Sequence, residues 1–306
     1  MDDSESAIIA GEADLFKEQT ELYKEVFHNT YEVLDNYNST EKIVITSAPN
    51  VEHFEPTLYN KRVYVVSIDI FDACYSFVKN KKRVLLVSKA CSSNRGGGVQ
   101  TGASGNEAEI CRRSTYWRAT RQIKDNYPLN TGALVYAENI QIFKSGIENN
   151  YTIHEPFSVD LLNVVLPSSP ICMTFDGKDT YEHVKDKRAT MNVLAGIMNY
   201  SSLYDVIIIN NLGTSDAHPI DEFIELLYGA IHSTLSTCAN FVLVYSDGKH
   251  EQFMSDTLKD VFHKIKIKLD TEDKQYTTNV PAEEQQSAPV TRRVIQPRET
   301  LVDKYD

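Results

Sequence analysis

The sequence lacks long apolar runs, paired cysteines and regularly spaced histidines, and each absence excludes a class of protein. No stretch of eighteen apolar residues occurs, so we expect no membrane span. The five cysteines lie far apart and form no CxxC pair, which argues against a structural zinc site and a disulfide framework. The eight histidines show neither HxxxH nor HExxH spacing. We therefore expect no metal and no cofactor.

The charge balance is strongly acidic, with a formal net charge of -12. Such a chain repels duplex DNA, so we expect no direct DNA binding. It also repels a polyanionic ligand at long range, so a phosphate site must depend on local backbone N–H groups and helix ends. The N-terminus is acidic and has no basic segment followed by an apolar run, so no secretory signal is predicted. With unpaired cysteines, this favours an intracellular location, cytoplasmic or nuclear.

Alternating strand-like and helix-like segments predict a single α/β domain over residues 13–270. Short apolar runs predict strands at 42–47, 62–70, 83–88, 159–166, 205–210 and 241–245, and a hairpin over 132–143. Amphipathic spacing predicts helices at 13–36, 69–79, 105–120, 179–199, 219–237 and 252–265. Residues 1–12 are expected to form a mobile acidic leader, and residues 271–306 a disordered tail. Helices on both faces of a sheet place a ligand beyond the carboxyl ends of its strands.

The segment from Asn94 to Ser114 joins a glycine-rich loop to the start of a helix (NRGGGVQTGASGNEAEICRRS). It follows the buried strand at 83–88 and contains Gly96, Gly97 and Gly98 in succession. Glycine permits positive φ and lets a ligand approach the main chain, while a helix start offers free N–H groups to phosphate. A plain surface loop is the alternative. The position between a buried strand and a helix favours the phosphate site.

The charged residues of the following helix also have ordinary structural explanations. Ser104 and Glu107 have the spacing of a capping box, in which the carboxylate returns to the N–H of the cap residue. Glu109 would be stabilised by the helix dipole in the first turn. Arg112 and Arg113 can pair with Glu109 across one turn, on a face exposed to solvent.

The same segment resembles the microbial-type poly(ADP-ribose) glycohydrolase family, whose signature is three glycines, a short spacer and Gln-Glu-Glu. Here Gly96–Gly98 are followed, after seven residues, by Asn106, Glu107 and Ala108. Residues 65–72, 132–144 and 188–219 carry a weaker resemblance, so that it extends over about residues 20–250. The resemblance implies a macrodomain-like fold, a three-layer α/β/α sandwich with a mixed central sheet, and recognition of ADP-ribose.

The resemblance also implies roles for individual residues. In the family the second Glu of the signature is the catalytic acid, and the first helps to hold the ribose. Glu107 takes the first position here, and Ala108 stands where the acid is expected. Alanine cannot protonate a leaving oxygen. Glu107 is thus the candidate catalytic residue, provided that the loop shifts by one residue. The implied ligand contacts are Asn94, Gly96, Gly97, Gly98, Val99, Asn106, Gly213, Thr214 and Ser215.

The second loop of the site departs from the family. Where the family has a glycine-rich turn, residues 211–218 retain only Gly213. Thr214 and Ser215 could still donate hydrogen bonds, although Asp216 would repel a phosphate. The alternative is an ordinary turn that caps the next helix. Arg95, where the family often has proline, either supplies a positive charge to a diphosphate or lies in solvent.

Three functions are compatible with these features. The first is an ADP-ribosyl glycohydrolase that acts on poly(ADP-ribose) or an ADP-ribosylated protein. The second is a catalytically inactive module that binds or sequesters ADP-ribose, and Ala108 favours it. The third is a scaffold that has lost the ligand, which the reduced second loop permits. The intact glycine loop is compatible with the first two.

Overall fold

The computed structural model describes residues 3–37, 41–54, 63–168, 171–173, 179–213, 218–233 and 240–245. The helix predicted at 252–265 and the tail predicted at 271–306 lie outside these residues. In the part of the chain that is described, no helix combines the length and apolar character needed to cross a bilayer.

The described residues form nine strands and six α-helices. The strands are β1 (Lys42–Ser47), β2 (Val63–Val66), β3 (Val84–Lys89), β4 (Ala133–Lys144), β5 (Ile153–Val164), β6 (Ile171–Met173), β7 (Asp179–Tyr181), β8 (Val206–Asn210) and β9 (Asn240–Val244). The helices are α1 (Asp3–Val33), α2 (Ile70–Val78), α3 (Asn106–Arg113), α4 (Tyr116–Thr120), α5 (Val184–Met198) and α6 (Ile220–Ser233). Four short 3-10 helices are η1 (Leu34–Asn36), η2 (Arg95–Thr101), η3 (Arg121–Asn126) and η4 (Ile147–Asn149).

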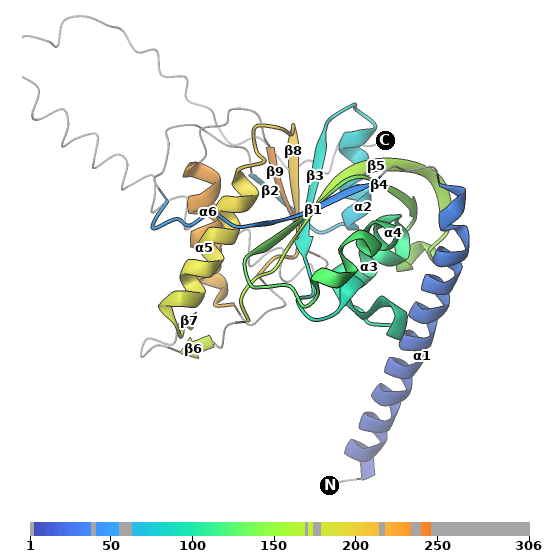
Figure 1. Cartoon of the computed structure of the whole chain (residues 1–306). Coiled ribbons are helices and arrows are strands. Elements are labelled where there is room, and N and C mark those ends of the chain that lie inside the picture. The colour runs from blue at the N-terminus through green and yellow to red at the C-terminus, as the bar shows by residue number, and fades with distance from the viewer. Residues whose placement is uncertain are drawn as a thin grey trace, which may run out of the picture. The chain divides into compact units, whose positions relative to one another are not determined.

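Seven strands form a mixed sheet in the order β1-β4-β5-β3-β8-β9-β2. The strands from β5 to β2 are parallel, while β4 runs antiparallel to both of its neighbours, β5 and β1. Helices α5 and α6 lie on one side of this sheet and α2, α3 and α4 on the other, with α1 running along the outside of α3 (Figure 1). The predicted three-layer α/β/α sandwich with a mixed central sheet is confirmed.

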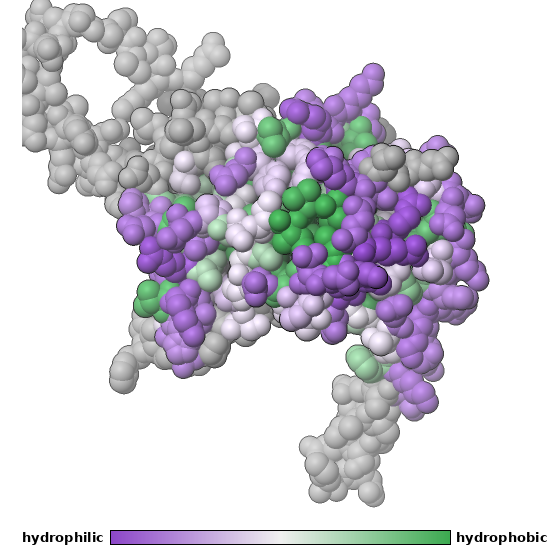
Figure 2. Space-filling model, viewed as in Figure 1, coloured by the Kyte–Doolittle hydropathy of each residue, from purple (hydrophilic) through white to green (hydrophobic). Residues whose placement is uncertain are grey.

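The central strands are buried on both faces. Val84–Val87 of β3 and Val206–Ile209 of β8 are fully enclosed, as expected for continuous apolar runs in a parallel sheet. The side of the molecule shown in Figure 2 is mainly hydrophilic, with an apolar patch near its centre, where β1 crosses in Figure 1. Because the buried core fixes the positions of these strands, it also fixes the relative positions of the polar residues that follow β2, β3 and β8.

The hairpin predicted over 132–143 is wrong. These residues form one long strand, β4, which pairs with β5 to make the hairpin. The polar pair Glu138–Asn139 forms a bulge within this strand: the register shifts between Ala137 and Ile140, and Asn139 has a φ of 55°. The backbone N–H of Asn139 donates to the Asp160 carboxylate at 2.8 Å. A side chain from the neighbouring strand thus stabilises the bulge, which local sequence does not reveal.

Two predicted helices also differ in extent. The helix predicted over 105–120 is divided into α3 and α4 at Ser114, whose backbone is extended and forms a bridge to Ile142 of β4. Helix α1 begins at Asp3, so the residues expected to form a separate leader continue the helix. Their alanine and glutamate content favours this conformation.

Candidate functional site

A tight glycine loop connects β3 to α3. Gly96, Gly97 and Gly98 have φ values of 67°, 63° and 76°, all in the left-handed region that glycine adopts without strain. The Gly97 N–H donates to the Asn94 carbonyl at 3.0 Å. Three consecutive glycines are required here because three consecutive residues take this backbone conformation.

The loop is pressed closely against the two helices that follow it. A Cβ atom on Gly96 would lie 2.6 Å from the Trp117 ring, and one on Gly97 would lie 3.0 Å from the Ala108 nitrogen. The Val99 side chain is fully buried in the core, while Asn94 is exposed. The loop thus presents its backbone, rather than the Val99 side chain, to its surroundings.

Glu107 is buried, with 2% of its surface exposed, and its carboxylate is held from outside its own helix. Oε2 accepts the backbone N–H of Cys91 at 2.7 Å, and Oε1 accepts the Tyr127 hydroxyl at 3.3 Å. The capping-box interpretation is wrong: the cap residue of α3 is Gly105, which makes no side-chain cap hydrogen bond. Burial raises the pKa of Glu107 to about 7, against the opposing effect of these hydrogen bonds.

We expect the stability contributed by Glu107 to decrease as the pH rises. Its folded pKa of about 7 lies above that of an exposed glutamate, so the folded state binds more protons in the interval between the two values. This contribution is therefore fully present below about pH 4 and is lost as the pH rises to about 7. Glu107→Gln keeps an acceptor for Cys91 but cannot ionise.

The measurement is the free energy of unfolding in urea at about pH 5 and about pH 8. Glu107→Gln should gain on the order of 3 kcal/mol relative to the wild type between these values. Both proteins share all other titrating groups, so the contributions of those groups cancel when the two pH dependences of the unfolding free energy are subtracted. An identical pH dependence in both proteins would rule out a raised pKa for Glu107.

Ala108 is fully buried and belongs to the apolar core. No carboxylate therefore stands at the position where the resemblance places the catalytic acid. Its neighbour Asn106, the first residue of α3, has a buried Nδ2 that finds no acceptor among the described residues. A buried amide without a partner carries a free-energy cost unless a ligand or water accepts from it.

A cleft of about 570 Å³ lies at the carboxyl ends of β2, β8 and β9. Ser67 and Asp69 follow β2, Asn210 and Asn211 lie at the end of β8, and Asn106 enters from the start of α3. This is the edge at which open α/β sheets bind ligands. Among the predicted ligand contacts, Asn106 lines the cleft, whereas Gly96 and Gly97 pack against α3 and α4.

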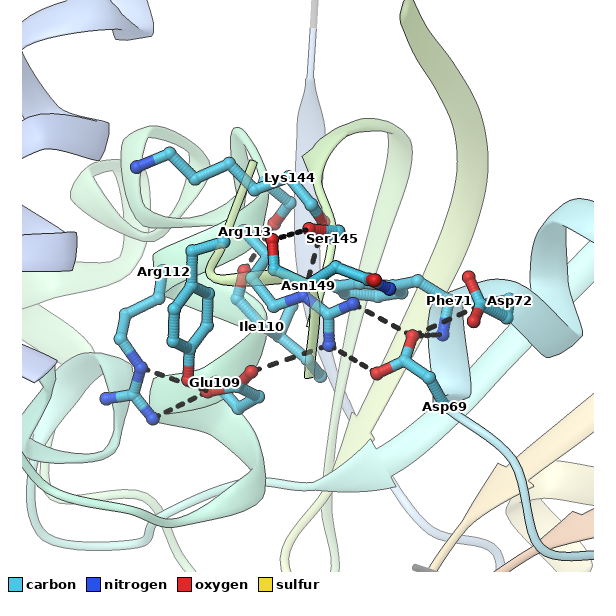
Figure 3. A network of polar contacts seen from close by, with 12 residues as sticks. Asp69, Phe71, Asp72, Glu109, Ile110, Arg112, Arg113, Lys144, Ser145 and Asn149 are labelled. Atoms are coloured by element: carbon cyan, nitrogen blue, oxygen red, sulfur yellow. Dashed lines mark hydrogen bonds and ion pairs between the residues drawn. The ribbon is translucent and has the colours of Figure 1, made fainter. Parts of the chain in front are cut away.

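One side of this cleft is built on an ion-pair network around Arg113, whose pairing with Asp69 the sequence did not predict (Figure 3). Arg113 donates two hydrogen bonds to Asp69, at 2.7 and 2.8 Å, and a third to Glu109 at 3.4 Å. Its Nε donates to the Lys144 carbonyl, and its guanidinium lies over the Phe71 ring. Burial opposes ionisation of Asp69, but the hydrogen bonds and charge of Arg113 outweigh it and hold its pKa below the usual range.

Arg112 lies on the other side of Glu109 and joins α3 to α1. Its Nε and a terminal nitrogen donate to Glu109 at 3.0 and 2.8 Å, and its guanidinium lies over the Tyr23 ring. The side chains of Arg112 and Arg113 are 0% and 2% exposed, so the expected solvent-exposed face is wrong, although the predicted pairing with Glu109 is confirmed. Helix α1 and the hairpin of β4 and β5 cover these two arginines in the folded protein. The spacing of residues along α3 does not reveal this cover.

Removing Arg113 should destabilise the fold strongly. Arg113→Gln leaves the half-buried Asp69 without its cation, while Glu109 keeps Arg112, and breaking a buried pair typically costs about 3–5 kcal/mol. Arg188→Gln is the matched control, because Arg188 contacts Glu52 at 3.3 Å with both side chains exposed, and such pairs contribute about 0–1 kcal/mol. Urea unfolding of both variants measures the difference. Equal losses would show that the network adds nothing beyond a surface ion pair.

The second predicted loop is described only in part. Gly213 has a φ of 86°, and a Cβ there would lie 2.5 Å from the Phe223 ring, so glycine is needed for packing against α6. Thr214 and Ser215 lie outside the described residues. The interpretation of this segment as a ligand loop or as an ordinary turn rests on the sequence.

Comparison with known proteins agrees with this geometry. Residues 2–145 match the family model described as microbial-type PARG, catalytic domain. The poly(ADP-ribose) glycohydrolase (PARG) from Thermomonospora curvata bound to the inhibitor ADP-HPD is similar in structure, with a TM-score of 0.60 and 14% identity, over 78% of this chain and 98% of that one. A Deinococcus radiodurans PARG in complex with ADP-ribose has a TM-score of 0.52 and 12% identity, over 81% of this chain and 92% of that one. No curated protein matches the sequence.

The match to the family model contains the glycine loop, α3 and the residues Asp69, Glu109 and Arg113 of the network of Figure 3, and the two structural matches cover 78% and 81% of this chain. The chain thus resembles the microbial-type PARG catalytic domain in sequence over residues 2–145, and it has the macrodomain-like fold of the bacterial enzymes.

Proposed function

We propose that this protein binds ADP-ribose, free or as part of poly(ADP-ribose) or an ADP-ribosylated protein, without cleaving it. The observation that carries the proposal is the juxtaposition of an intact glycine loop with the fully buried Ala108. The loop keeps the backbone geometry that suits a diphosphate, and the position beside it holds no acid.

Three features support binding. The start of α3, against which Gly97 packs, offers backbone N–H groups and the positive end of a helix dipole, which favour a phosphate. Gly105, at the start of α3, has no side-chain cap that would occupy those groups. The buried Nδ2 of Asn106 needs an acceptor, and it lies at the cleft. A ligand that carries both phosphate and sugar oxygens satisfies both requirements.

The carboxylates near the loop support a role without catalysis. Cleavage of a glycosidic linkage needs an acid that protonates the leaving oxygen and then activates water. Both oxygens of Glu107 accept hydrogen bonds from the protein, and Glu109 is bound by two arginines. Ala108 contributes neither an acid nor a base.

A hydrolase is the second candidate, and one observation favours it. The pKa of Glu107, raised to about 7 by burial, lies in the range in which a carboxyl group donates a proton efficiently at neutral pH. In that case Glu107→Gln would abolish turnover.

Incubation with labelled poly(ADP-ribose) distinguishes the two candidates. The proposal predicts that the protein retains the polymer on a filter but releases no ADP-ribose, while a bacterial PARG in a parallel reaction degrades it. Release of ADP-ribose that disappears in Glu107→Gln would contradict the proposal and establish the hydrolase.

A further inference from the structure

A second cavity, of about 440 Å³, lies where α1, the glycine loop and the segment from α4 to η3 meet. None of the residues that line it lines the cleft at the strand ends. Arg95, which immediately precedes Gly96, lies in its wall, so the cavity borders the glycine loop. Figure 2 shows strongly hydrophilic surface where α1 and α4 lie in Figure 1.

The charge of this cavity is opposite to that of the chain as a whole. Among the described residues, its lining contains Lys24, His28, Arg95 and Arg121 but no aspartate or glutamate, although the chain carries a net charge of -12. Lys24 and His28 have acidic neighbours on α1. Within the described residues, neither Arg95 nor Arg121 has a carboxylate within 4.0 Å. Two guanidinium groups are therefore available to an anion from outside.

Both arginines lie over aromatic rings. The Arg95 guanidinium is 4.2 Å from the centre of the Trp117 ring, and that of Arg121 is 5.5 Å from the centre of the Tyr31 ring. Phe27 packs edge-on against Trp117 and also lines the cavity. A guanidinium that stacks on a ring keeps its in-plane N–H groups free for phosphate oxygens. Aromatic and guanidinium faces are also the surfaces on which nucleic acid bases stack.

We infer that this cavity binds a second nucleotide unit of poly(ADP-ribose), next to the unit held at the glycine loop. The inference rests on the proposed function. A neighbouring unit of the polymer carries a diphosphate, which suits Arg95 and Arg121, and an adenine, which suits the exposed ring of Tyr31. The cavity thereby makes the protein bind the polymer more tightly than single ADP-ribose.

The test compares two variants in the full chain. Arg121→Gln removes one cavity charge, and Lys124→Gln removes one from the same short helix, η3, at an exposed position outside the cavity. Fluorescence anisotropy measures affinity for labelled ADP-ribose oligomers of about ten units, and calorimetry measures affinity for ADP-ribose. Arg121→Gln should bind the oligomer about 5–10-fold more weakly and lower its salt dependence by about one ion. Its affinity for ADP-ribose should not change, and Lys124→Gln should match the wild type.

Each other outcome overturns the inference. If Arg121→Gln and the wild type bind the oligomer with equal affinity, the cavity does not take part in polymer binding. If Arg121→Gln and Lys124→Gln lose the same oligomer affinity, the effect comes from the net charge of the protein and not from the cavity. Displacement of the oligomer by single-stranded RNA with the same number of phosphates, at equal concentration, would make the cavity a general nucleic acid site. Absence of ADP-ribose binding by the wild type would refute the proposed function itself, and with it the inference.

Discussion

Replacing Ala108 with glutamate is expected to convert the protein into a glycohydrolase. The variant should release ADP-ribose from poly(ADP-ribose) about 10²–10⁴-fold faster than the wild type, the range that a positioned acid–base group contributes. The structure places this residue beside the glycine loop: a Cβ on Gly97 would stand 3.6 Å from the Ala108 Cβ. A carboxylate two bonds further along the side chain supplies the group that the site otherwise lacks.

Ala108→Gln is the matched control, because it adds almost the same volume without a proton donor. Both variants place a polar side chain at a position that is fully buried, so urea unfolding should show a loss of stability in both, and a larger loss for glutamate because burying a charge costs more than burying an amide. Turnover in Ala108→Glu alone establishes that the rest of the site is assembled. If both variants fold and neither cleaves the polymer, the site lacks more than this one acid.

Replacing Gly97 with alanine should weaken ADP-ribose binding by at least about tenfold. Its φ of 63° is strained for any residue with a side chain, at a cost of about 1–3 kcal/mol. The added methyl group would also lie 3.0 Å from the Ala108 nitrogen and 3.2 Å from the Glu107 Cβ, so that the loop must separate from α3. We expect a loss of affinity of at least about tenfold by calorimetry, which corresponds to about 1.4 kcal/mol.

Gly105→Ala is the matched control for this substitution. Gly105 has an ordinary φ of -66°, and no atom lies within 4 Å of the position that a Cβ would take. This variant should keep the affinity of the wild type and change stability by no more than about 1 kcal/mol. Equal affinity in Gly97→Ala and Gly105→Ala would show that the glycine loop does not contact the ligand.

The parts of this structure that were predictable from sequence depend on local patterns. The apolar runs at 83–88 and 205–210 correspond to β3 and β8, because a strand buried on both faces must be apolar throughout. The backbone of the glycine loop was predictable because glycine adopts positive φ without strain, and Gly96, Gly97 and Gly98 all do so. The residues that follow these glycines begin α3, and the sequence shows directly that residue 108 is alanine.

The errors arise where a residue's partner is distant in sequence. Glu107 has the spacing of a capping box, yet Cys91 and Tyr127 hold its carboxylate. The Asp69–Arg113 pair joins residues that only the folded sheet brings together. Asn139 resembles a turn residue, but Asp160 on the neighbouring strand stabilises it as a bulge. Contacts of this kind depend on tertiary packing, and they determine the electrostatics of the site.

Whether the protein binds ADP-ribose is measured by calorimetric titration of the 306-residue chain with ADP-ribose. We expect saturable heat with one ligand per chain, and no release of ADP-ribose from polymer in the parallel assay. No heat at about millimolar ligand, the concentration at which even a binding free energy of about -4 kcal/mol would be visible, would contradict it.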